Sequence, residues 1–119
     1  MQDVYVIPIP AFETDLAGLE IQYPGITRDY ELLTELLETH PLAGLPFDHS
    51  QQDLWDVRYT DLYYTQGRSR GERTAIVIFL AFRDRNAFHV QPLAMYQESE
   101  WSKWSLDQQR EAIRARAFP

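Results

Sequence analysis

TAIVIFLAF, residues 74–82, is the stretch of sequence that decides the fold. Every position after the first is apolar, so a strand formed here has to be buried on both of its faces. The stretch is rich in β-branched and aromatic residues, and turn-forming segments at residues 66–72 and 83–86 bound it. The sequence therefore predicts a central β-strand around which a sheet is built.

The segments on either side of this strand also have the pattern of strands. Residues 53–65 alternate between two faces. One of these faces carries Trp55, Val57, Tyr59, Asp61 and Tyr63. Residues 88–96 follow the central strand after a short turn. Because short connections join neighbouring antiparallel strands, we expect a three-stranded antiparallel meander over residues 53–96.

Two further strands are predicted near the N-terminus. Residues 4–10 are rich in Val and Ile, but Pro8 and Pro10 cannot donate backbone hydrogen bonds, so this segment suits an edge strand. Residues 18–23 alternate between apolar and polar side chains and stop at Pro24. We expect them to pair with the edge strand, in an antiparallel sheet of three to five strands.

Two helices are predicted, one in each half of the chain. Residues 27–40 have Leu33 and Leu37 at helical spacing, and Pro41 marks the end of this helix. The C-terminal helix, about residues 99–117, contains Ser-Leu-Asp-Gln at 105–108, which has the form of a capping box. Packed against the sheet, these helices give a two-layer α+β fold. The pattern leaves open whether the second face of the sheet is covered.

The composition indicates one globular domain, residues 1–119, with no cofactor and no metal site. The chain is 45% apolar and contains three Trp, seven Tyr and six Phe, which is ample for one hydrophobic core. It contains no Cys, which excludes disulfides, thiolate metal sites and a cysteine nucleophile. Its apolar runs are too short for a signal peptide or a membrane span, so we expect a cytoplasmic location and no membrane binding.

The acidic residues are concentrated in the first half of the chain. Residues 1–64 carry twelve acids and two Arg, a formal charge of −10, whereas residues 65–119 carry six acids and nine basic residues, a charge of +3. The net charge of −7 and the single Lys argue against nucleic-acid binding, which needs basic side chains to neutralise phosphates. An acidic surface instead favours a partner protein with a basic surface.

Acidic and aromatic side chains lie close together in residues 48–61, which form the candidate contact surface for such a partner. Aromatic side chains often anchor interfaces, and carboxylates beside them steer basic partners. The predicted partner-binding residues are Asp48, Asp53, Trp55, Asp56, Tyr59 and Asp61. Around the turn at residues 66–72, Arg68, Arg70 and Arg73 are candidate contacts for an anion.

Known enzyme motifs are absent from the sequence. It contains no P-loop, no dinucleotide-binding glycine pattern, no serine-hydrolase elbow and no zinc-protease motif. We therefore expect a small acidic non-catalytic protein that acts by binding another protein, as an inhibitor, immunity, regulatory or assembly factor.

Two other functions remain open at this point. The first is a small-molecule-binding or catalytic domain whose cleft is formed around Asp61, Tyr63 and His89. The second is a self-associating structural subunit. Its contacts in a homo-oligomer would be residues 4–10 and an exposed pair, Trp101 and Trp104.

Overall fold

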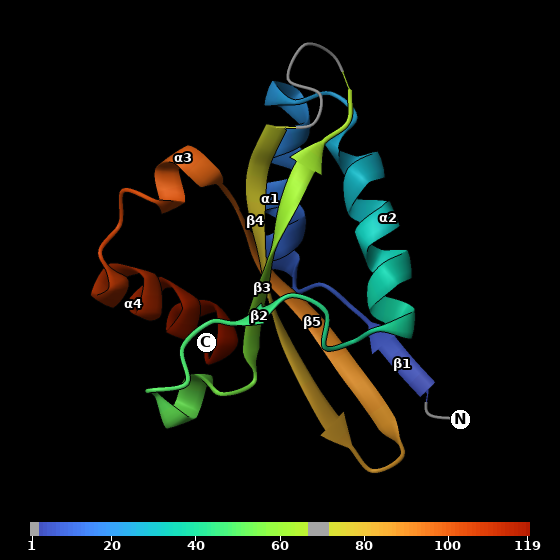
Figure 1. The fold of residues 1–119 in the computed structure, drawn as a ribbon, viewed down its shortest axis with the longest axis vertical. Coiled ribbons are helices and arrows are strands. Elements are labelled where there is room, and N and C mark those ends of the chain that lie inside the picture. Colours follow the sequence, from blue (N-terminus) through green and yellow to red (C-terminus); the bar gives the residue numbers. More distant parts are fainter. Residues whose placement is uncertain (1–2, 67–71) are drawn as a thin grey trace.

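The protein folds as one mixed β-sheet with helices packed on it (Figure 1). The structure is a computed structural model that describes residues 3–66 and 72–119. The elements in chain order are β1 (Asp3–Val6), α1 (Pro10–Gln22), α2 (Ile26–Thr39), β2 (Leu45–Pro46), the 3-10 helix η1 (Gln52–Leu54), β3 (Val57–Tyr64), β4 (Glu72–Asp84), β5 (Ala87–Gln97), α3 (Glu98–Trp101) and α4 (Leu106–Ala117). The strand order is β1-β5-β4-β3-β2, in which β1 is parallel to β5 and the other neighbours are antiparallel. The predicted α+β class is confirmed.

The predicted meander forms the centre of the sheet as β3, β4 and β5. β4 lies between the other two strands and is buried on both faces, as predicted: Ala75, Val77 and Phe79 belong to one core. Ile76 and Ile78 belong to a second core on the opposite face. The first strand of the meander begins at Val57 and not at residue 53, because the preceding residues form η1 and a turn.

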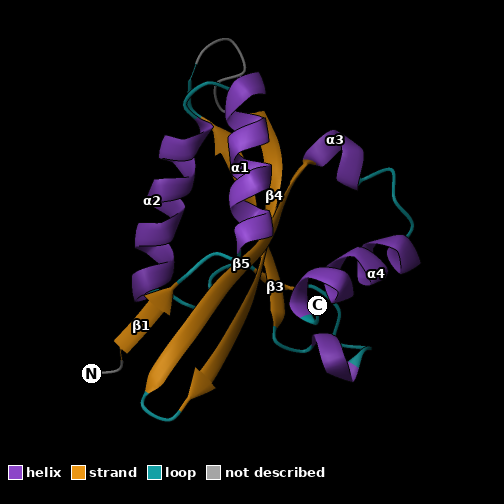
Figure 2. Ribbon diagram, turned by 180° about the vertical axis from the view of Figure 1, so that it is seen from behind, coloured by secondary structure: helices purple, strands orange, loops and turns teal. Residues whose placement is uncertain are grey.

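Each core is closed by its own pair of helices (Figure 2). α1 and α2 cover the first core and contribute Phe12, Ile26 and Leu37, which are fully buried. α3 and α4 cover the second core and contribute Trp101 and Ile113. The second face of the sheet is therefore covered as well.

The predicted strand at residues 18–23 is wrong, because these residues lie in α1 and at its C-terminal end. Pro10 occupies the first helical position, where its missing N–H is not needed. From there Phe12, Leu16 and Leu19 recur at helical spacing and pack in the first core. Burial of this row of side chains outweighs the short alternation, which is too brief to define a strand.

The helix expected at about residues 99–117 is divided into α3 and α4. α4 begins after Ser105, whose hydroxyl accepts from the Gln108 backbone N–H while the Gln108 amide oxygen accepts from the Ser105 N–H. The predicted capping box is thus confirmed. Trp101 is only 7% exposed and stacks on Tyr96, with ring centroids 5.0 Å apart, and Trp104 is half-buried beside both rings. The prediction of an exposed tryptophan pair is therefore wrong.

A buried carboxylate holds the first turn of α2 at the end of β3. Asp29 is 5% exposed and accepts from the backbone N–H of Thr65, at 3.2 Å, and from its hydroxyl. Beside it the Tyr64 hydroxyl donates to the Pro24 carbonyl. Because buried polar groups need partners, these bonds fix where α2 starts on the sheet. α2 itself matches the helix predicted at residues 27–40.

An ion pair between the two ends of the chain covers the open edge of β5. β1 pairs with residues 87–90 of β5, and the N–H groups of Ile7 and Ile9 then donate to the carbonyls of Val90 and Pro92, so the edge of β5 is left to other partners only beyond Pro92. There the Met95 N–H donates to Asp15 (3.1 Å), and Arg116 donates to the Leu93 carbonyl (2.8 Å). Arg116 and Asp15 also bind each other through two bonds, at 3.0 and 3.3 Å. α1 and α4 are thereby joined around the edge of the sheet.

Asp15→Ala should lower the free energy of unfolding by about 2 kcal/mol, because the Arg116 guanidinium and the Met95 N–H both lose their carboxylate. Urea denaturation measures this change. Glu13→Ala is the control, since Glu13 is an exposed acid on the same helix, and its effect should stay within about 0.5 kcal/mol. Equal effects of the two substitutions would contradict a stabilising role for the ion pair.

Candidate functional site

Two of the predicted contact residues, Asp48 and Asp53, are held by arginines of α4. Arg110 Nε lies 2.6 Å from Asp48 Oδ2, and the side chains of this pair are 19% and 10% exposed. Arg114 binds both carboxylate oxygens of Asp53, at 2.8 and 3.2 Å, and also donates to the Gln51 amide oxygen. The loop at residues 48–53 is therefore fastened to α4 by two ion pairs.

These contacts lower the pKa of both acids. Hydrogen bonds from the Ser50 hydroxyl and the Arg110 guanidinium lower the pKa of Asp48. The Arg114 guanidinium lowers the pKa of Asp53, and the same pair raises the pKa of Arg114. Both carboxylates are thus charged at neutral pH, and each charge is matched within the molecule.

Trp55 and Asp56 lie in the turn that follows η1 and are exposed. The Trp55 indole N–H donates to the His49 carbonyl at 2.9 Å, while 55% of the residue remains accessible. The Asp56 backbone carbonyl accepts from the Ala81 N–H of β4 and leaves the carboxylate in solvent. Both side chains are therefore available to a partner.

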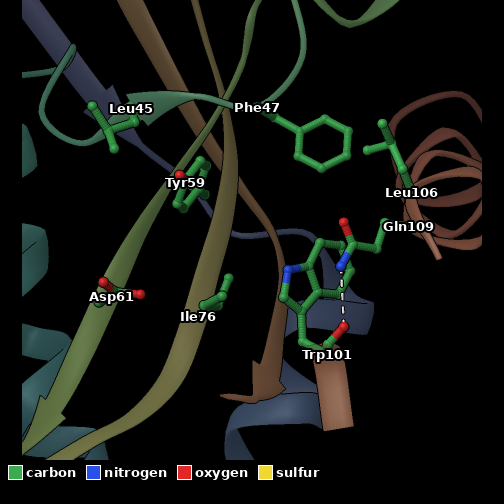
Figure 3. A pocket seen from close by; sticks show the side chains of 8 residues that line it. All are labelled: Leu45, Phe47, Tyr59, Asp61, Ile76, Trp101, Leu106 and Gln109. Atoms are coloured by element: carbon green, nitrogen blue, oxygen red, sulfur yellow. Dashed lines mark hydrogen bonds between the residues drawn. The ribbon is translucent and has the colours of Figure 1, made fainter. Parts of the chain in front are cut away.

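Tyr59 and Asp61 lie on β3 and line a cleft of about 480 Å³. Figure 3 shows the eight lining side chains around an open space, with Tyr59 and Asp61 across it from Trp101 and Gln109. The lining residues are Leu45, Phe47, Tyr59, Asp61, Ile76, Trp101, Leu106 and Gln109. The cleft therefore lies between β2 to β4 on one side and α3 and α4 on the other.

A glycine places β2 against this cleft. Gly44 has a φ of 83°, and a Cβ built on it would lie 2.3 Å from the Tyr59 carbonyl oxygen. Any larger residue would therefore push the chain away from β3. Arg58 secures the same segment by donating to the carbonyls of Leu42 and Gly44 at 2.8 and 2.9 Å.

Other residues named from the sequence lie elsewhere. Tyr63 is 52% exposed, and neither it nor His89 lines the cleft that contains Asp61. His89 stacks on Phe82 with ring centroids 5.3 Å apart, and its ring also lies 5.8 Å from that of Tyr5. Arg68 and Arg70 lie outside the described residues, as does the side chain of Arg73.

A second acidic surface, which the sequence reasoning did not single out, lies on α2. Residues 10–39, which span α1 and α2, contain seven acids and one Arg, a formal charge of −6. Glu31, Glu35 and Glu38 are spaced i, i+4 and i+7, so they form one row on the outside of α2. Glu35 and Glu38 have no ion-pair partner among the described residues. The helical period alone could have found this row.

An apolar groove lies beside the acidic row. Leu32 and Leu36 are 45% and 46% exposed on the neighbouring flank of α2, and this flank leads into a groove of about 460 Å³. The groove is lined by Leu36, His40, Pro41, Leu42, Ala43 and Phe88. We call Leu32, Glu35, Leu36 and Glu38, together with this groove, the α2 surface.

Comparison with known proteins adds no family to these observations, because no protein-family model and no curated protein matches the chain. In the described ranges, no three His, Asp or Glu side chains are grouped so that they could hold a metal ion. The helices in those ranges include none that is long and apolar enough to cross a membrane. The function has to be inferred from the two sites themselves.

Lowering the pH should destabilise the protein through Asp48 and Asp53. Their pKa values are lower in the folded chain than in the unfolded chain, so as the pH falls the unfolded chain takes up protons first. The stability that these ion pairs contribute is complete above about pH 5 and is lost as the pH falls through about 4 toward the lower folded values. Thermal unfolding between about pH 3 and pH 6 measures this loss.

The stability of the double variant Asp48→Asn/Asp53→Asn should depend less on pH over the same range than that of the original protein. Asp56→Asn is the control, because the Asp56 side chain is exposed and makes no ion pair among the described residues. The same pH dependence in the double variant and the original protein would show that these ion pairs do not stabilise the fold.

Proposed function

We propose that this protein is a small non-catalytic binding protein that recognises a basic, partly apolar segment of another protein, as an inhibitor, immunity, regulatory or assembly factor does. The observation that carries this proposal is the acidic row Glu31, Glu35 and Glu38 beside the exposed leucines and the groove of the α2 surface. Its partner would place Lys or Arg side chains on the row and apolar side chains in the groove.

The electrostatics of α2 favour a cation at its C-terminal end. The last turn of the helix contains no basic residue, so none of its own side chains offsets the negative end of the helix dipole. Glu31 meets Arg28 at 3.4 Å, but both side chains are more than half exposed, so this pair neutralises little of the row. A basic partner would therefore gain favourable contacts along the whole length of the row.

The arginines of α4 do not cancel the charge of this row. Arg110, Arg114 and Arg116 bind Asp48, Asp53 and Asp15, respectively. Residues 98–117, which span α3 and α4, carry four acids and four bases and have no net formal charge. The acidic character is thus concentrated on the helical layer formed by α1 and α2, where it can increase the association rate of a basic partner.

Glu35→Lys/Glu38→Lys should reduce capture of the partner from native cell extract roughly tenfold at low salt, because the acidic row then repels basic side chains. The captured protein, identified by mass spectrometry, should also be released by high salt. The matched control is Asp84→Lys/Glu111→Lys, which changes the charge by the same amount at two exposed acids outside α2. This control should leave capture unchanged.

A further variant distinguishes the α2 surface from the residues predicted by sequence. Asp56→Lys alters the one acid of the 48–56 segment that is exposed and has no ion pair with another described residue. Loss of capture by Asp56→Lys but not by the α2 variant would place the contact at the segment predicted from sequence. If neither variant affects capture, or capture does not depend on salt, the proposal fails.

A further inference from the structure

We propose that the cleft between β3 and the α3–α4 pair is a second binding site, which takes a protonated amine carried on a small apolar body. This site lies on the face of the sheet covered by α3 and α4, whereas α2 packs on the other face. The proposal is therefore independent of the function proposed for the α2 surface. At about 480 Å³ the cleft is in the range of small-molecule sites.

Several side chains of the cleft wall are aromatic or aliphatic and are largely fixed before a ligand enters. Trp101 is 7% exposed, and its ring lies flat on Tyr96 with an interplanar angle of 10°. The ring centroid of Phe47 lies 6.2 Å from that of Trp101. Ile76 is also buried in the second core. Rings held in this way lose little conformational freedom when a ligand binds, so the cost of ordering the site is small.

The polar groups of the cleft favour a hydrogen-bond donor with positive charge. Asp61 is the one charged residue among the eight described residues that line it, and Tyr59 adds a hydroxyl on the same strand. The Gln109 NH₂ group already donates to the Trp101 carbonyl at 3.0 Å, which leaves the amide oxygen as its free acceptor. A carboxylate, a hydroxyl and an amide oxygen suit an ammonium group, which has three donors.

Among the described residues that line the cleft there is no Lys or Arg, so none of them would pair with an anion. Arg110 follows Gln109 on α4, but its guanidinium binds Asp48 and Asp107. A carboxylate can accept from several donors at once, so recognition by Asp61 does not require that it lack another partner. The aromatic ring of Tyr59, which lines the cleft, adds a further attraction for a cation.

Titration with three probes of equal shape tests the charge preference. Benzylamine, benzyl alcohol and benzoate share one ring and differ in charge, and ¹H–¹⁵N NMR spectra locate the residues that each perturbs. Benzylamine should bind with a dissociation constant on the order of 1 mM and shift the backbone signals of Tyr59, Ile76 and Gln109. Benzyl alcohol should bind roughly tenfold more weakly, and benzoate should not bind.

Asp61→Asn should weaken benzylamine binding roughly tenfold and leave benzyl alcohol binding unchanged, because it removes the charge at constant shape. The control is Asp56→Asn, at an exposed acid that does not line the cleft. If Asp61→Asn fails to fold, the comparison of the three probes on the original protein decides by itself. Equal binding of benzylamine and benzyl alcohol, shifts outside the cleft, or no shift at tens of millimolar benzylamine would each overturn the proposal.

A fourth probe distinguishes a free amine from the lysine of a protein. Nα-acetyl-lysine amide carries the same ammonium group on a flexible aliphatic chain. Tighter binding of this probe than of benzylamine would identify a lysine side chain as the natural occupant. Tighter binding of benzylamine would identify a free small molecule. Either result requires that binding weaken with added salt, as a charge-dependent contact does.

Discussion

Burial of β4 on both of its faces is the constraint on which the rest of the structure depends. A strand whose side chains are apolar on both faces needs a helical layer, or cover, on each face. The chain supplies α1 and α2 before the meander for one face and α3 and α4 after it for the other. Each cover brings polar groups to the rim of its core, where they have to be paired or solvated. The α2 surface lies on the outside of one cover, and the cleft of Asp61 lies between the sheet and the other.

The arginines of α4 connect the two halves of the chain. Arg110, Arg114 and Arg116 bind acids that precede them by 62, 61 and 101 residues, and so fasten the 48–53 loop and α1 to the C-terminal helix. Three of the twelve acids in residues 1–64 are therefore matched across these contacts. The acids of α2 that have no such partner form a smaller surface than the whole acidic half of the chain. This surface lies next to an apolar groove, so a partner would gain apolar contacts there in addition to charge attraction.

The two proposed sites lie on opposite sides of one sheet, the α2 surface with the first core and the cleft with the second. The α2 surface would recognise charge and apolar contact over an extended area, whereas the cleft would recognise one cation in a partly open space. Both sites would select positive charge through acids other than Asp15, Asp48 and Asp53, which the arginines of α4 bind. A single basic partner or two separate ligands would satisfy this arrangement, and the separate variants at Glu35 and Asp61 distinguish them.

Local patterns in the sequence determined β4, α2 and the capping box at Ser105, since each depends on residues a few positions apart. They also led to Tyr59 and Asp61 as neighbours on one strand face. Alternation over residues 18–23 failed as evidence for a strand, because it covers less than two helical turns and the buried row of Phe12, Leu16 and Leu19 decides that segment. Only the tertiary structure decided that Asp48 and Asp53 are held by α4 and that Trp101 and Gln109 complete the cleft. These contacts join residues far apart in the chain. Which residues meet depends on how the helices pack on the two faces of the sheet, and the periodicity of a local sequence segment carries no information on that packing.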